Sequence, residues 1–290
     1  AREYMHLFRL VLAVVLVVFA AACEPPVSST PDTGSDDASD VVETIDAPQT
    51  RIATFNVRRL FDKTCDSGRC DADDFEEVPS EQEYDLVLQR TADAITAMDA
   101  DVVLLQEIEN AIVLDDLRSR LDPEYDVSVM GETGWAASLD VAVVSRGELL
   151  ETREYRDSRP LELPNGGQSE FTREFLEVRL QLEGEELIVF CAHFKSQSND
   201  DPERRLAEAQ EAREIVDEVV SANPEALVVL GGDFNDTPGS DPLNALVGDG
   251  GLQRAGAELP ADQMWTYDYR GDRQAIDHLL IAPNNGGGYV

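Results

Sequence analysis

The stretch that decides the fold is LVVLGGDFND, residues 227–236. Its apolar run predicts a buried strand, and the two glycines that follow allow another backbone to approach closely. Asp233 and Asn235 come next, so an extended chain would carry both side chains on one side. A carboxylate can orient or deprotonate a water molecule, and an amide can donate a hydrogen bond to a phosphoryl oxygen. Glycine, aspartate and asparagine are also common where a turn ends a strand, so this stretch alone leaves a functional site and a plain turn both open.

Other apolar runs end in polar side chains in the same way. RIATFN ends at Asn56, DVVLLQE at Glu107 and ELIVFCAH at His193, while Asp277 lies within the run AIDHLLIA. Taken singly, Glu107 could be a solvated strand end and His193 a hydrogen-bonded structural residue. Because several separate strands each deliver such a side chain, the pattern predicts a site assembled at one rim of a sheet scaffold.

Two amphipathic helices separate these strands. Apolar residues recur at helical spacing over residues 84–98 and again over residues 206–219. The second helix would begin with Asp201 as its N-cap and Pro202 in its first turn. Strands outnumber helices and the two do not alternate strictly, which predicts an α+β fold of mixed sheets packed face to face with helices outside.

The first 23 residues predict an export signal. Arg2 and Arg9 form a basic start, and residues 10–20 are an apolar core too short to span a bilayer comfortably. Small residues then lead directly to Cys23, an arrangement that resembles a bacterial lipobox in which Cys23 is lipidated. An ordinary signal peptide cleaved at this place, with Cys23 incidental, is the alternative.

The rest of the chain divides into a linker and one large domain. Residues 24–50 are rich in Pro, Ser, Thr and Asp and predict a disordered acidic linker. Residues 51–290 suffice for one two-sheet domain. We expect an exported protein at the cell envelope or outer surface, or otherwise secreted, that meets the membrane only through its lipid anchor.

The net charge restricts the choice of partners. The chain carries 23 basic and 59 acidic residues, which gives −36, and only Lys63 and Lys195 are lysines. Such a charge repels polyanions at low salt, so taken alone it argues against a DNA-binding protein.

The cysteines predict one small disulfide. Cys65 and Cys70 enclose the loop CDSGRC, and no other Cys or His pair completes a metal-ligand set, which favours a disulfide in an exported protein. Cys191 is expected to be a buried strand residue. The acidic segment CDADDFEE could bind Ca²⁺, but its spacing fits no EF-hand and a solvated loop is favoured.

Seven blocks taken together resemble the endonuclease/exonuclease/phosphatase superfamily, the metal-dependent phosphodiesterase fold of deoxyribonuclease I. They are IATFNVRRL, DVVLLQEIEN, LDVAVVSR, FTREFLEVRL, AHFKSQ, VLGGDFNDTP and AIDHLLIA. The resemblance runs in order over residues 51–283, and AHFKSQ is most similar to secreted bacterial nucleases. It implies a four-layer α/β/β/α sandwich of two mixed β-sheets.

The resemblance also implies a role for each rim residue. Glu107 would hold a divalent metal, Mg²⁺ or Mn²⁺, with Asn56 as ligand or phosphate contact, and Ca²⁺ is a candidate structural ion. His193 would bind or protonate the phosphate. Asp233 would position or activate water, and Asn235 would stabilise the charge that builds on phosphorus.

Two further residues of the resemblance concern the phosphate region and the end of the chain. Arg173 would help to gather the phosphate, and Asp277 would orient the imidazole of a histidine in a later Ser-Asp-His block. No such block follows AIDHLLIA, so we expect the domain to be truncated at its C-terminus; a genuinely impaired chain is the alternative. His278 would face away from Asp277, because successive strand residues point to opposite faces, and its replacement should change activity little.

These inferences predict an exported, metal-dependent phosphodiester hydrolase, a monomeric nuclease that cleaves DNA or RNA. A phosphatase or phospholipid phosphodiesterase of the same fold is one alternative, which the net charge favours. A catalytically impaired surface-binding lipoprotein is another. A local basic rim would favour the nuclease, and its candidate residues are Arg58, Arg59, Arg173, Lys195 and Arg204.

Overall fold

The computed structural model describes residues 14–19, 49–260, 262–283 and 288–289. Strand β1 (Val14–Phe19) falls within the predicted signal segment and pairs antiparallel with β2 (Gln49–Leu60). The predicted lipidation residue Cys23 and residues 24–48 of the predicted linker lie outside the described residues. The division into signal, linker and domain therefore stays a prediction.

The first sheet brings the ends of two parallel strands to one edge. Its strands follow the order β16 (Gly288–Tyr289), β1, β2, β3 (Val102–Ile108), β5 (Asp140–Ser145) and β4 (Val127–Gly131). β2 and β3 are parallel, with Asn56 opposite Gln106, and β5 runs antiparallel to β3. Asn56 and Glu107 therefore reach the same edge.

The second sheet brings three predicted site residues side by side. Its strands follow the order β12 (Gln253–Arg254), β15 (Asp277–Ile281), β11 (Leu227–Asp233), β10 (Glu185–His193), β9 (Leu176–Leu182) and β6 (Glu148–Glu154). His193 is paired with Asp233 in the parallel β10–β11 ladder, and Asp233 with Asp277 in the antiparallel β11–β15 ladder.

Two short hairpins and the helices complete the described fold. The hairpins pair β7 (Leu161–Glu162) with β8 (Gln168–Ser169) and β13 (Tyr267–Tyr269) with β14 (Asp272–Gln274). The helices are α1 (Glu81–Met98), α2 (Ala111–Arg118), α3 (Pro202–Ala222) and α4 (Asp241–Val247). As predicted, Asp201 caps α3, accepting a hydrogen bond from the backbone of Arg204. None of the helices in these described ranges is long and apolar enough to cross a membrane.

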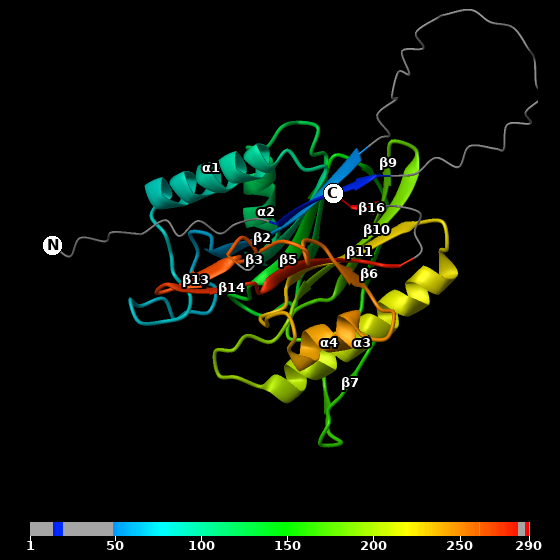
Figure 1. The fold of residues 1–290 in the computed structure, drawn as a ribbon. Helices are drawn as coiled ribbons and strands as arrows, with labels where there is room; N and C mark the ends of the chain where they lie inside the picture. The colour runs from blue at the N-terminus through cyan, green and yellow to red at the C-terminus, as the bar shows by residue number, and fades with distance from the viewer. Residues whose placement is uncertain (1–13, 20–48, 261, 284–287, 290) are drawn as a thin grey trace, which may run out of the picture.

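Alternating side chains along the strands build the layers. On β3, Val103 and Leu105 pack in the cluster that includes α1 and α2, whereas Leu104 packs in the cluster between the sheets. On β11, Leu230 packs with α3 and α4, and Val229 faces the other sheet. Figure 1 shows α1 and α2 on one side of the strands and α3 and α4 on the other. The predicted α+β fold of two mixed sheets is confirmed.

Candidate active site

Irregular pairing at the ends of β2 and β3 sets the directions of the side chains of Asn56 and Glu107. The sequence predicts that β2 ends at Asn56, but in the structure it continues to Leu60. The pairing of β2 with β3 shifts between these two residues. The pairing of β3 with β5 shifts in the same region, and Glu107 there has a φ of 67°. An extra unpaired residue bends a strand and changes the direction of a side chain, and such irregularities are frequent next to active sites.

Asn56 joins the acids of the two sheets. Its Nδ2 donates to Glu107 Oε1 at 3.1 Å and to Asp233 Oδ2 at 3.0 Å. Its Oδ1 accepts the backbone N–H of Arg58 at 2.9 Å, and Glu107 Oε2 accepts that of Arg59 at 2.7 Å. Asn56 is therefore a donor between two carboxylates. Its Oδ1 has a second lone pair beside the one that the Arg58 N–H uses, so the geometry is compatible with both predicted roles, metal ligand and phosphate contact.

A tight turn orders Asp233 and Asn235. A Cβ on Gly232 would lie 1.9 Å from the carbonyl oxygen of Ala192, so only glycine lets β11 pass β10 at this point. Asp233 Oδ1 accepts the backbone N–H of Asn235 at 2.8 Å, and Asn235 Nδ2 donates to the carbonyl of Phe194 at 3.1 Å. The sequence left a turn and a site open as alternatives. In the structure the turn itself holds the two side chains at the rim.

His193 is a neutral, buried imidazole. Its Nε2 lies 3.8 Å from Asp233 Oδ2, and its Nδ1 has no hydrogen-bond partner among the described residues. Burial, with the nearby Arg173 guanidinium, holds the pKa of His193 well below its usual value. At neutral pH the ring can donate an N–H to a phosphoryl oxygen. Of the two predicted roles, this environment favours binding the phosphate over protonating it.

The neighbouring carboxyls of the second sheet disfavour negative charge. Burial raises the pKa of Asp233 to about 6, and Glu107 acts in the same direction. Burial and the adjacent Asp233 raise the pKa of Asp277 well above its usual value. Asp277 Oδ1 is buried and has no hydrogen-bond partner within the described part of the chain. The rim thus contains three carboxyls that repel one another, Glu107, Asp233 and Asp277.

A divalent cation fits this donor set. Hard cations take oxygen ligands, and Mg²⁺ typically uses one or two protein carboxylates and completes its shell with water and substrate phosphates. Glu107 supplies a half-buried carboxylate at the end of β3. Positive charge there would relieve the repulsion by Glu107 that, after burial, helps to raise the pKa of Asp233. Glu107 is therefore the residue that would hold the ion.

Fewer basic side chains are available to a phosphate in the structure than the five that the sequence predicts. Arg59 forms an ion pair, and Arg204 and Lys195 donate hydrogen bonds to backbone carbonyls. Arg58 is exposed and Arg173 half-buried, and neither side chain forms a hydrogen bond or ion pair with the residues described. These two arginines are the cations of that set left to meet a phosphate.

His278 lies on the face of β15 opposite to Asp277, as the sequence predicts. It is 2% exposed, and its Nε2 lies 3.0 Å from the carbonyl oxygen of Asp236. Its ring packs 5.4 Å from that of Phe234 between centroids. His278 thus stabilises the turn after Asp233 through contacts with Phe234 and Asp236. The sequence did not suggest this structural role.

His278→Ala is expected to lower the free energy of unfolding by about 3 kcal/mol, because it removes a buried ring and leaves the Asp236 carbonyl without its partner. Urea unfolding measures this loss. The kcat of the folded protein should change little, since the ring does not face the rim. Leu150→Ala, at an exposed position of β6, is the control, and an equal stability for both variants would contradict this role.

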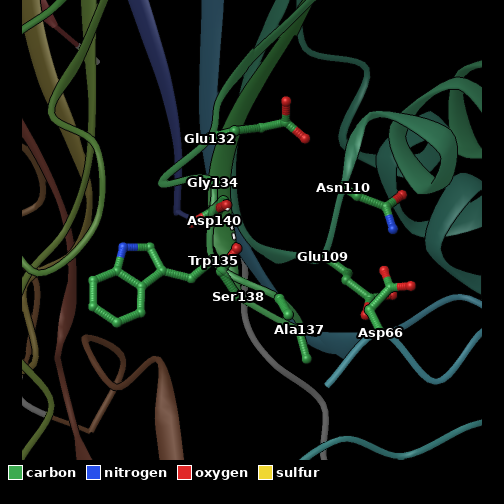
Figure 2. Close-up of a pocket in the computed structure, with 10 residues that line it drawn as sticks. Asp66, Glu109, Asn110, Glu132, Gly134, Trp135, Ala137, Ser138 and Asp140 are labelled. Carbon is green, nitrogen blue, oxygen red and sulfur yellow. Dashed lines mark hydrogen bonds between the residues drawn. The ribbon is translucent and has the colours of Figure 1, made fainter. Parts of the chain in front are cut away.

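One pocket of the structure has a volume of about 440 Å³ (Figure 2). Its lining includes the carboxyls of Asp66, Glu109, Glu132 and Asp140 and the exposed ring of Trp135. None of the predicted site residues lines it. Because four acidic side chains repel a phosphate group, the pocket is no substitute for the rim cluster as a phosphate site.

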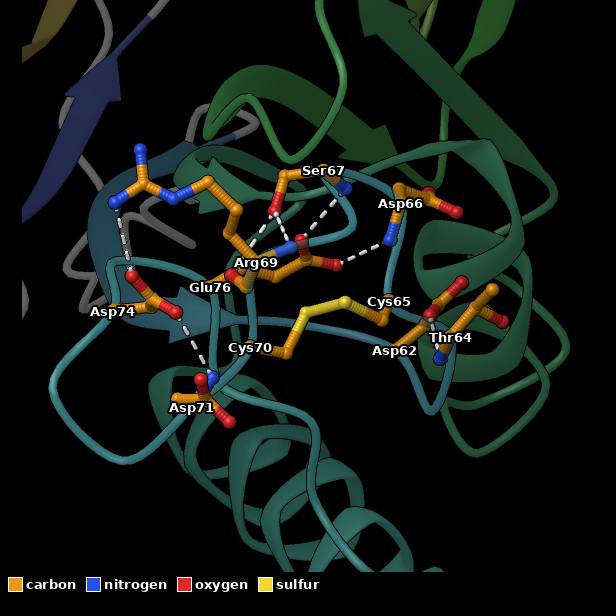
Figure 3. Close-up of a disulfide and its surroundings, with 10 residues drawn as sticks. All are labelled: Asp62, Thr64, Cys65, Asp66, Ser67, Arg69, Cys70, Asp71, Asp74 and Glu76. Atoms are coloured by element: carbon orange, nitrogen blue, oxygen red, sulfur yellow. Dashed lines mark hydrogen bonds and ion pairs between the residues drawn. A yellow bond between two sulfur atoms is a disulfide. The ribbon is translucent and has the colours of Figure 1, made fainter.

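A disulfide joins Cys65 and Cys70 and closes an acidic loop (Figure 3). Glu76 accepts the backbone N–H groups of Asp66 and Ser67 at 2.6 and 2.8 Å, which folds the loop onto itself. Within the described ranges, the only group of three His, Cys, Asp or Glu side chains close enough to share an ion is Cys65, Cys70 and Glu76. Its sulfurs are used in the disulfide, so these three side chains do not form a metal-ligand set. Cys191 is buried and free.

Sequence reasoning missed residues that support the rim from behind. Thr266 Oγ1 accepts the backbone N–H groups of Ile276 and Asp277, both at 3.1 Å, and Gln197 Nε2 donates to the carbonyl of Asn235 at 2.9 Å. Neither residue follows an apolar run, so no local pattern distinguishes them.

Comparison with known proteins identifies the family and the fold. Residues 51–285 match the sequence model of the "Endonuclease/Exonuclease/phosphatase family". Comparison with curated protein sequences gives no match.

Solved structures share the fold at low sequence identity. TDP2 from C. elegans is 16% identical with a TM-score of 0.55, covering 80% of this chain and 64% of its own. The human nocturnin catalytic domain with bound sulfate is 14% identical with a TM-score of 0.57, covering 81% and 83%. An endonuclease/exonuclease/phosphatase protein from Bacteroides vulgatus is 19% identical with a TM-score of 0.54, covering 81% and 87%. This chain thus spans less than two thirds of the TDP2 chain.

Proposed function

Because this chain belongs to the endonuclease/exonuclease/phosphatase family, we propose that it is a divalent-metal-dependent phosphodiester hydrolase whose substrate is nucleic acid. The observation that carries the proposal is the meeting of an acid and an amide from the first sheet with a histidine and two acids from the second. Asn56 hydrogen-bonds to both Glu107 and Asp233, so the two sets form one cluster.

The attack on phosphorus needs a water molecule and an acceptor for its proton. Asp233 would orient this water, since its Oδ2 lies at the centre of the cluster, beside Asn56 and His193. Asp277, whose buried Oδ1 has no partner among the described residues, has the environment of an acid that holds an imidazole. That histidine would belong to the Ser-Asp-His block that the resemblance implies.

The developing negative charge needs donors and cations. Arg173 and the N–H of His193 would bind the phosphoryl oxygens, and Asn235 would donate a hydrogen bond to an oxygen on which negative charge develops. Glu107 would hold Mg²⁺ or Mn²⁺, which when bound offsets charge on the phosphoryl oxygens.

An aromatic and cationic hairpin beside the rim supports a nucleic acid substrate. β13–β14 leads directly into the strand of Asp277, and its parallel Tyr267 and Tyr269 rings are 40% and 51% exposed. Arg273 stacks on Trp265 at 4.4 Å from the ring centroid. Exposed aromatic rings next to arginines are a platform on which unpaired bases stack.

Tyr269→Ala is expected to raise the KM for single-stranded DNA about tenfold, because one lost base–aromatic stack costs about 1–3 kcal/mol. The turnover of bis(p-nitrophenyl) phosphate, which has no base to stack, should stay unchanged. Leu149→Ala, exposed on β6, is the control. An equal rise in KM for both substrates would contradict a stacking role.

Export forms part of the same proposal. A disulfide such as Cys65–Cys70 persists in oxidising compartments, which supports a protein acting outside the cytoplasm. We include in the proposal lipidation at Cys23, an anchor as the only membrane contact, and a monomeric state. Labelled palmitate should be incorporated by the wild type and not by Cys23→Ser.

The protein should degrade DNA or RNA with Mg²⁺ or Mn²⁺, and this activity should stop on addition of a chelator. The net charge of −36 favours a second candidate, a phosphatase or phospholipid phosphodiesterase. Turnover of a small phosphoester or phospholipid without nucleic acid cleavage would select that candidate. No hydrolysis of any phosphoester would favour a surface-binding role instead.

A further inference from the structure

A fully buried carboxylate lies next to the segments that carry Arg173 and His193. Glu208, on α3, is 0% exposed. Its Oε1 accepts the backbone N–H of Thr172 at 2.6 Å, and its Oε2 accepts that of Lys195 at 2.5 Å. Thr172 directly precedes Arg173, and Lys195 comes two residues after His193. One side chain therefore ties together two segments that are far apart in sequence and that both carry phosphate-facing residues.

Arg205, one turn earlier on α3, holds the same region through different groups. It is 4% exposed, and its Nη1 donates to the carbonyl of Lys195 at 3.1 Å. Its Nε donates to Asp236 Oδ2 at 2.9 Å, in the turn that carries Asp233. The Lys195 residue is thus held at its N–H by Glu208 and at its carbonyl by Arg205.

Burial of the Glu208 carboxylate costs free energy that an apolar side chain at the same position would avoid. Burial raises the pKa of Glu208, so an ionised carboxylate is disfavoured there. The neighbouring positions Ala209 and Ala212 are buried and apolar. An apolar side chain at a fully buried helix position avoids the desolvation of a carboxylate. Glu208 differs from its apolar neighbours in that it satisfies two backbone N–H groups next to site residues.

We propose that Glu208 and Arg205 are positioning residues that set the placement of Arg173, His193 and the Asp233 turn relative to one another. The inference rests on the proposed function. They act through the backbone of Thr172 and Lys195 and through Asp236, and touch no substrate. Glu107, which would hold the metal, belongs to the other sheet, and the hydrogen bonds of Glu208 and Arg205 described above do not reach it.

Glu208→Gln tests the role because it keeps the size of the side chain and replaces one acceptor by a donor that faces a backbone N–H. The kcat for a phosphodiester is expected to fall about 10-fold to 100-fold, since small misplacements of catalytic groups have effects of that size. Mg²⁺ affinity, measured by calorimetry, should stay within about twofold of the wild type because Glu107 is untouched. Glu214→Gln, exposed on the same helix, should match the wild type.

A role in stability alone would lower the melting temperature and leave the kcat of the folded molecules unchanged. A folded Glu208→Gln variant with wild-type kcat and KM would overturn the proposal. Should that variant fail to fold, Asp236→Asn decides instead. Asp236 is half-buried, and its replacement weakens the contact with Arg205, so kcat should fall in the same direction by a smaller factor.

Amide hydrogen exchange separates this proposal from the proposed function. The Thr172 and Lys195 amides should both exchange slowly in the wild type. In Glu208→Gln at least one of them should exchange at least about tenfold faster, since glutamine keeps only one of the two acceptor oxygens. This result needs no enzymatic activity. A wild type without hydrolase activity would refute the proposed function, while unchanged exchange at both amides would refute the backbone contacts on which the positioning role depends.

Discussion

Asp233→Asn is expected to lower kcat about 1,000-fold at neutral pH, because the replacement removes the carboxylate that orients the attacking water. The variant should remain folded. Burial and Glu107 disfavour the ionised form of Asp233, whose pKa is raised to about 6, and a neutral amide removes that cost. This gain offsets the hydrogen bond from Asn56 that the replacement disturbs. Steady-state hydrolysis of a phosphodiester measures the loss, and a thermal melt confirms folding.

The matched control is Asp241→Asn, an exposed acid at the start of α4 that should retain full activity. Asp233→Asn with kcat within tenfold of the wild type would show that another group activates the water. The environment of Asp277 would then make it the next residue to replace, since it lies beside Asp233 on the adjacent strand.

Glu107→Gln is expected to weaken Mg²⁺ binding at least about 100-fold, the upper range seen when even an outer partner of a metal ligand is lost. At fixed Mg²⁺ the activity should fall in proportion and be partly restored by raising the Mg²⁺ concentration. Titration calorimetry gives the affinity independently of catalysis. Chelation of the wild type should abolish activity in the same assay.

Glu132→Gln provides the control for general charge effects, because Glu132 lines the acidic pocket (Figure 2) and is not one of the rim residues. If both variants bind Mg²⁺ equally well, Glu107 does not hold the ion. The cation would then have to be sought among the other acids of the rim.

The fold and most of the rim were predictable because both depend on the pattern of side chains along strands. The apolar runs that end at His193 and Asp233 identify buried strands and the side chains at their ends. Parallel pairing of these strands then places the two residues together, as the β10–β11 register shows. The opposite directions of Asp277 and His278 follow from the alternation of a strand.

The rest could not be predicted because it depends on contacts between distant segments. The continuation of β2 past Asn56 arises from a shift in its pairing with β3, which the sequence of either strand alone does not encode. Glu208 lies in a helix of mixed polarity, and an acid beside Ala209 has the same local pattern whether it meets solvent or two backbone N–H groups. The partners of Arg59 and Arg204, which reduce the basic rim, are likewise distant in sequence.

The sharing of the rim between two sheets makes catalysis sensitive to the distance between those sheets. That distance is set by tight apolar packing, since a Cβ on Gly231 would lie 2.6 Å from Leu104 of the facing sheet and 2.5 Å from Leu279 of its own. A change of packing deep in this layer would separate Glu107 from Asp233 while leaving each sheet's hydrogen bonds intact. Heat, pressure or mild denaturant should therefore inactivate the protein before it unfolds, so that its working range is narrower than its folding range.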